Sequence, residues 1–204
     1  MTAGEHRIQF AEHEGGPVRR ATTTLAAAFA VGMVLMGAGR AGVGRAAARD
    51  RANTFSGSCK VSGTAVFDPP LTNTPQAATQ RVQATGTCSG TFTSRNGRAH
   101  QLSVAPVSWQ TTEYTANASC SAGTDSGSGK ITFQNGTIRF TISEASGPGF
   151  AAFTLKGAEG GSAAGQANIS PSANPVAIAQ ACAGAGLAEA PVDIQVSTTP
   201  AISG

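Results

Sequence analysis

Charged side chains are scarce in this sequence: Asp, Glu, Lys and Arg make up 12% of its 204 residues, against about 25% in average globular domains. This scarcity excludes a coiled coil and a charged disordered chain. Residues 1–53 hold seven Arg and four acidic residues, so the whole net charge of +3 lies there. Residues 54–204 hold seven basic and seven acidic residues. We therefore expect no nucleic-acid partner, because phosphate binding needs a basic surface.

Histidine is equally scarce, with His100 as the only one after residue 53. A site with two or three histidine ligands is thereby excluded, and no Cys-x-x-Cys spacing occurs, so we expect no metal and no cofactor. His100 lies three residues beyond the Asn96-Gly97 pair, a turn signal. A surface position is therefore expected for it rather than the role of a catalytic base.

Aromatic residues make up 5% of the chain, with one Trp and one Tyr. Trp109 and Tyr114 are therefore the candidate ligand-facing residues, for instance in a sugar site. Acidic residues are thinly scattered after residue 53, and a glycosidase pair of Asp125 with Glu144 or Glu159 has no support from any local pattern. We expect no catalytic residues and no enzyme.

The N-terminal quarter has the pattern of an export segment. Residues 1–20 form a basic region that ends in Arg19-Arg20, and residues 21–39 contain no charge. Such a run indicates either a cleaved signal peptide, on the general or the twin-arginine route, or an uncleaved membrane anchor. Residues 40–53 are then a cleavage region or a disordered tether. The remainder, residues 54–204, is expected outside the cytoplasm, secreted or held at the membrane only by residues 21–39.

The four cysteines all follow the export segment, and in an exported chain an even number predicts disulfides. Cys59 and Cys88 each lie in a run of alternating small or apolar and polar residues. If these runs pair antiparallel with 59 opposite 88, position 61 meets 86, 65 meets 82, and the apolar faces coincide. We predict a Cys59–Cys88 bridge, which leaves Cys120 to pair with Cys182.

Turn signals divide the rest of the chain into short alternating segments. Around Asn135-Gly136 we expect a two-residue hairpin loop with Phe133 opposite Ile138. Around Asn96-Gly97 we expect a three-residue loop with a left-handed Gly97, which sets Gly90 against Leu102 and Cys88 against Val104. Residues 121–129, rich in Gly and Ser, are expected to form a flexible loop. One short helix is predicted near 175–183, with Asn174 as its cap.

The segments together predict a single all-β domain over residues 54–204, with about 8–9 antiparallel strands in a β-sandwich or an up-and-down barrel. The expected function is a non-catalytic extracellular or cell-surface module with a structural or binding role and an unidentified cell-envelope partner. The use of Ala, Arg and Gly is typical of a GC-rich bacterial genome. The first alternative is a barrel that binds a small apolar ligand. The second is an extracellular hydrolase that uses His100 or a carboxylate pair.

An apolar ligand would require a cavity inside the barrel. The residues expected to line it are Val82, Phe92, Phe133, Phe140, Phe153 and Leu155.

Overall fold

The computed structural model describes residues 51–198 and 200–204. The predicted segments 1–20 and 21–39 and most of 40–53 lie outside the described residues. Within the described residues, no helix has both the length and the apolar character needed to cross a membrane.

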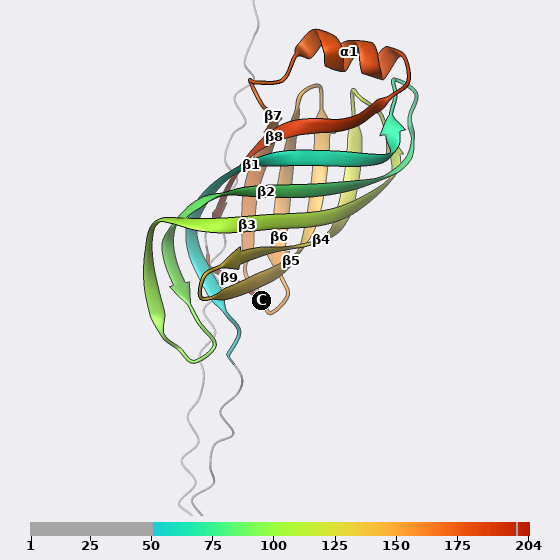
Figure 1. Cartoon of the computed structure of the whole chain (residues 1–204). Coiled ribbons are helices and arrows are strands. Elements are labelled where there is room, and N and C mark those ends of the chain that lie inside the picture. The colour runs from blue at the N-terminus through green and yellow to red at the C-terminus, as the bar shows by residue number, and fades with distance from the viewer. Residues whose placement is uncertain (1–50, 199) are drawn as a thin grey trace, which may run out of the picture. The chain divides into compact units, whose positions relative to one another are not determined.

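Eight antiparallel strands form a closed up-and-down barrel (Figure 1), in which each strand pairs with the next one along the chain and the last pairs with the first. A ninth short strand pairs with the start of the first. Because the sheet closes on itself, the domain is an up-and-down barrel and not a β-sandwich, the other predicted architecture. The strands are β1 (Thr54–Leu71), β2 (Gln76–Thr93), β3 (Ala99–Ala118), β4 (Gly123–Phe133), β5 (Gly136–Gly147), β6 (Phe150–Gly157), β7 (Ser162–Ile169), β8 (Leu187–Thr198) and β9 (Ile202–Ser203).

The pairing of β1 with β2 follows the predicted register. Cys59 lies opposite Cys88, Val61 opposite Gly86 and Ala65 opposite Val82. The disulfide between Cys59 and Cys88 is present, and both residues are buried in the barrel interior. A period of two holds the apolar side chains on the inner face of both strands, because successive strand residues point to opposite faces.

The hairpin between β2 and β3 confirms the predicted loop, with Gly97 at a φ of 82° and Gly90 opposite Leu102. The predicted pairing of Cys88 with Val104 is wrong, since Cys88 lies opposite Ala105. One extra residue enters β3 between these pairs, and Val104 takes a φ of 54° with an exposed side chain. This bulge shifts the register by one residue, which local alternation did not predict.

The hairpin between β4 and β5 differs from prediction by two residues. Phe133 lies opposite Gly136 and Ile138 lies opposite Ile131, so the turn falls at Gln134-Asn135. Gly136 belongs to the strand, where a β-carbon would lie 2.9 Å from the ring of Phe92. The glycine thus serves close packing inside the barrel rather than the turn. Because the register between β4 and β5 differs from the predicted one by two residues, the apolar side chains of both strands remain on the inner face.

Residues 121–129 are not the flexible loop that was predicted, because β4 begins at Gly123. Within this strand Asp125 is buried, while Thr124, Ser126 and Ser128 are exposed. The sequence did not show the alternation of inward and outward residues in β4, because the next inward positions are Gly127 and Gly129, which have no side chain. Gly127 has no side chain where β4 passes Thr112 and Glu113 of β3.

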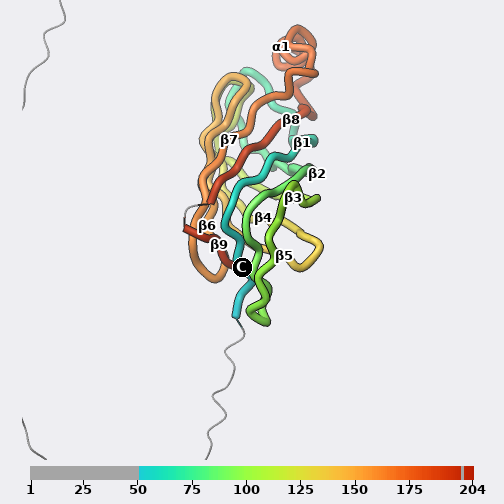
Figure 2. Tube along the Cα trace, turned by 90° about the vertical axis from the view of Figure 1, so that its left-hand side faces the viewer, coloured from blue at the N-terminus to red at the C-terminus, as the bar shows by residue number. Residues whose placement is uncertain are grey.

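Helix α1 (Pro175–Ala183) lies at one end of the barrel, in agreement with prediction. Asn174 caps it by accepting hydrogen bonds from the amides of Val176 and Ala177. Figure 2, turned by 90°, shows the helix at the same end.

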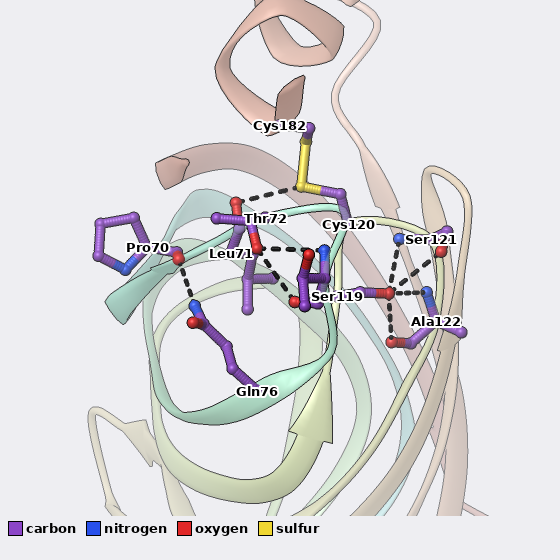
Figure 3. Close-up of a disulfide and its surroundings, with 10 residues drawn as sticks. Pro70, Leu71, Thr72, Gln76, Ser119, Cys120, Ser121, Ala122 and Cys182 are labelled. Carbon is purple, nitrogen blue, oxygen red and sulfur yellow. Dashed lines mark hydrogen bonds between the residues drawn. A yellow bond between two sulfur atoms is a disulfide. The ribbon is translucent and has the colours of Figure 1, made fainter. Parts of the chain in front are cut away.

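The predicted Cys120–Cys182 disulfide joins α1 to the loop between β3 and β4 (Figure 3). The amide of Cys120 donates to the carbonyl of Thr72, and the amide of Asn73 donates to the carbonyl of Cys182. Three segments are therefore bound together as a cap, defined as residues 72–75, 119–122 and 175–183.

The two halves of the barrel interior are filled differently. At the end away from α1, aromatic rings pack against one another: the centroid of Phe133 lies 5.0 Å from those of Phe55 and Phe92. These three rings belong to the main hydrophobic cluster of the barrel. The half under the cap has a second apolar cluster around Leu71, Ala78, Leu187 and neighbouring residues.

Candidate functional site

A cavity of about 120 Å³ lies inside the barrel at the α1 end. Its walls come from the inner faces of β1 to β8 and from the cap, whose Ser119 and Cys120 line it. Most of the lining is apolar and includes Phe67, Val82 and Ile142. A cavity with apolar walls and a few polar groups is the usual form of a small-molecule site.

Three carboxyl groups line this cavity: Glu113 of β3, Asp125 of β4 and Glu144 of β5. Asp125 and Glu144 lie directly opposite each other on neighbouring strands. All three are on the inner face, with side chains 2%, 8% and 9% exposed. We call these residues the carboxyl cluster. The domain places three of its seven acidic residues in this cavity.

Neighbouring polar side chains satisfy only part of the carboxyl cluster. The hydroxyl of Thr111 donates to Glu113 Oε1 at 2.7 Å. Thr115 hydrogen-bonds Asp125, and Gln80 hydrogen-bonds Glu144. Glu113 Oε2 and Asp125 Oδ1 are buried without any hydrogen-bond partner. A buried oxygen without a partner costs about 1–3 kcal/mol of stability.

Burial raises the pKa of all three groups, because a low-dielectric interior disfavours the charged form. Burial raises the pKa of Glu113 to about 7, against a smaller lowering by the Thr111 hydrogen bond. Burial also raises the pKa of Glu144 to about 8, and the charges of Glu113 and Asp125 add to that rise. The pKa of Asp125 is raised by burial as well. Near neutral pH the cluster therefore holds protons that exposed carboxyl groups would have lost.

The structure places the two candidate ligand-facing residues on opposite sides of β3. Trp109 lines the cavity, is 1% exposed, and packs with its ring centroid 5.1 Å from that of Phe140. Tyr114 lies on the outer face, 57% exposed. His100 is half-buried opposite Phe92, near the start of β3 and remote along the strand from Glu113.

The residues expected to line a cavity fall into two groups. Val82 and Phe153 line it. Phe92, Phe133, Phe140 and Leu155 are not among the lining residues, although all six belong to the main hydrophobic cluster of the barrel. The cavity thus lies toward the cap and excludes four of the six expected lining residues.

The inward position of Glu113 could have been predicted from the alternation of inward and outward residues along β3. Trp109, Thr111, Glu113 and Thr115 share one face, so an inward Trp109 implies an inward Glu113. The apolar alternation of Tyr114, Ala116 and Ala118 obscured this. Of the proposed acidic pairs, the structure brings together Asp125 with Glu144. Glu159 lies in the turn between β6 and β7, where its amide donates to the carbonyl of Ser203 of β9.

Among residues 51–198 and 200–204, no group of three or more His, Cys, Asp or Glu side chains is arranged to hold a metal ion. The carboxyl groups themselves can act in two ways. It can bind hydrogen-bond donors and cations, or it can exchange protons through carboxyl groups that titrate near neutral pH.

Comparisons of the chain with protein families, with curated proteins and with solved structures gave no match.

Proposed function

We propose that the protein is an exported bacterial binding protein without catalytic activity, whose barrel holds a small ligand with an apolar body. The observation that carries this proposal is the cavity under the cap. In one half of the barrel aromatic rings pack against one another, while the other half leaves about 120 Å³ between mostly apolar walls.

The cavity volume limits the size of the ligand. An apolar protein cavity of about 150 Å³ is known to bind benzene. A cavity of about 120 Å³ with an opening to solvent accordingly suits a ligand with a single ring or a short branched chain. Burying one such group stabilises a complex by roughly 1.5–3 kcal/mol.

The turn between β5 and β6 contributes residues to the cavity wall, among them Gly147 and Gly149. Phe150 follows this turn, lines the cavity and is 54% exposed, and its ring lies over Gly147. The cap occupies another part of the same end, held by the Cys120–Cys182 bridge. Because Phe150 is the one exposed large apolar side chain among the described lining residues, we propose that a ligand enters beside it rather than through the cap.

Two disulfides favour an oxidising compartment, which supports the export part of the proposal. Residues 21–39 supply the expected export signal or anchor. N-terminal sequencing of protein recovered from culture medium tests this: a start after residue 39 supports cleavage and release. Recovery only from the membrane fraction with an intact N-terminus would support the anchored form.

Ligand binding can be measured through Trp109, because it is the only tryptophan of the chain and it lines the cavity. We expect toluene to change its emission in a saturable manner. Ala151→Phe should abolish this response, since Ala151 lines the cavity. Ala152→Phe is the matched control, because Ala152 is exposed on the same strand. Binding that is absent in the unmodified protein, or equally lost in both variants, contradicts the proposal.

Hydrolysis by a carboxyl pair is the second candidate, favoured by the facing positions of Asp125 and Glu144. Glycosidases use two such groups, one of them with a raised pKa. The cavity volume argues against it, since about 120 Å³ does not hold a sugar together with its leaving group. Incubation with 4-nitrophenyl glycosides tests it. Release of nitrophenol by the unmodified protein but not by Asp125→Asn would establish the hydrolase.

A further inference from the structure

We propose that the ligand is a small apolar amine, whose ammonium group binds among Glu113, Asp125 and Glu144 while its apolar body contacts the cavity wall. This inference rests on the proposed function and names the chemical class of the ligand.

Two unpartnered oxygens point to a missing hydrogen-bond donor. Glu113 Oε2 and Asp125 Oδ1 line the cavity without a partner, on side chains that are only 2% and 8% exposed. Nearly all buried polar groups in proteins have a partner, so two orphans in one cavity call for an explanation. An ammonium group has three donors, enough for one carboxylate oxygen from each member of the cluster.

The charge balance of the cavity indicates that this donor is a cation. No Lys, Arg or His lines the cavity in the part of the chain that the structure describes. Asp125 and Glu144 face each other directly, and facing like charges destabilise a sheet. A buried negative charge is tolerated when it is paired with a positive one. The ligand would supply the positive charge that the chain leaves out.

The absence of metal-ligand geometry favours an organic cation over a metal ion. The described residues contain no set of three or more acidic, His or Cys side chains placed to hold a metal. A hydrated metal ion would also gain nothing from the apolar walls around Val82, Ile142 and Phe153. An amine on an apolar body uses both parts of the cavity.

The raised pKa values agree with this assignment. Without a ligand, protons on Glu113 and Glu144 relieve the repulsion within the cluster. An ammonium group would favour the carboxylate form and displace those protons into solvent. Amine binding near pH 7 should therefore release protons, whereas binding of a neutral ligand should not.

Four probes of similar size separate the possibilities in the full, disulfide-bonded protein: toluene, benzyl alcohol, benzylamine and benzoate. With Trp109 emission as the signal, we expect benzylamine to bind roughly tenfold or more tightly than toluene at pH 7.5, and benzoate not to bind. Toluene or benzyl alcohol binding as tightly as benzylamine would overturn the amine assignment but leave the proposed binding function intact. Binding of none of the four would overturn both.

Conservative variants test the role of the carboxyl groups. Glu113→Gln and Glu144→Gln should each weaken benzylamine binding by roughly tenfold relative to toluene binding. Saturable toluene binding by a variant also shows that the variant is folded. Glu189→Gln is the control, since Glu189 is exposed on β8. Calorimetry in buffers of different ionisation enthalpy should detect proton release with benzylamine. Equal benzylamine affinity in all variants would overturn the assignment.

Discussion

Asp125 and Glu144 face each other across β4 and β5, and both side chains point into the barrel. Two acidic residues in this relation repel one another when both are ionised. Glu113 on β3 adds a third carboxyl group to the same cavity. A core built for stability alone would hold apolar side chains at these positions, so the cluster has a cost that a functional role would explain.

Glu144→Gln should stabilise the ligand-free protein at pH 8. The amide keeps the hydrogen bond with Gln80 but removes a charge that burial, and then the charges of Glu113 and Asp125, disfavour. We expect the free energy of unfolding to rise by roughly 1–3 kcal/mol at pH 8 and to change little at pH 4.5, where Glu144 is already neutral. Urea unfolding followed by Trp109 emission measures both values. A loss of stability at pH 8 would show that the cluster supports the fold instead.

The unmodified protein should lose stability as pH rises from about 5 to 8. Glu113 and Glu144 titrate at about 7 and about 8 in the folded state, above the ordinary value of 4.5 that applies when the chain is unfolded. Between pH 4.5 and these higher pKa values, the unfolded chain has lost protons that the folded protein retains. The free energy of unfolding therefore falls as the pH rises. We expect a fall of a few kcal/mol, levelling off above pH 8. Urea midpoints across this range measure it, and a flat profile would contradict the raised pKa values.

Removal of the Cys120–Cys182 bridge should loosen the cap without opening the barrel. This bridge closes a sequence separation of 62 residues, and its loss costs up to about 4 kcal/mol in the loop-entropy model. In Cys120→Ala/Cys182→Ala protein, acrylamide should quench Trp109 emission more strongly while the β-sheet signal persists. The matched control is Cys59→Ala/Cys88→Ala, which removes a buried bridge far from the cap. Equal quenching in both variants would argue against a local role for the cap.

Gly127→Ala should destabilise the barrel by on the order of 2–4 kcal/mol. A β-carbon at this position would lie 2.1 Å from the carbonyl oxygen of Thr112, so β3 and β4 would have to separate beside the carboxyl cluster. Ser128→Ala, on the outer face of the same strand, should change stability by less than about 0.5 kcal/mol. Thermal unfolding of both variants checks this. A fully stable Gly127→Ala protein would mean that the two strands are not held at this spacing.

Local patterns were sufficient for the all-β class, the helix and both disulfides. The alternation around Cys59 and Cys88 fixed one face of each strand, and only one register matched them. The choice between sandwich and barrel depends on the pairing of β1 with β8, for instance Val61 opposite Ile194. Such a pairing joins distant segments, so no local signal indicates it.

The candidate site was harder to predict than the fold, because its residues resemble parts of the surface. Asp125 lies between glycines and serines, a composition typical of loops. Glu113 stands next to Tyr114, which was the residue expected to face a ligand. In the structure Glu113 is the inward residue, 2% exposed, and Tyr114 lies on the outer face, 57% exposed.

The pairing of β1 with β8 also determines how this chain can be assembled. The first strand gains its second neighbour only after residues 187–198 have been made, because these residues form β8. Until then the growing sheet has two open edges, which are ready to pair with other chains. Loss of β8 would therefore convert a closed barrel into an aggregation-prone sheet, so the order of folding matters as much as the final contacts.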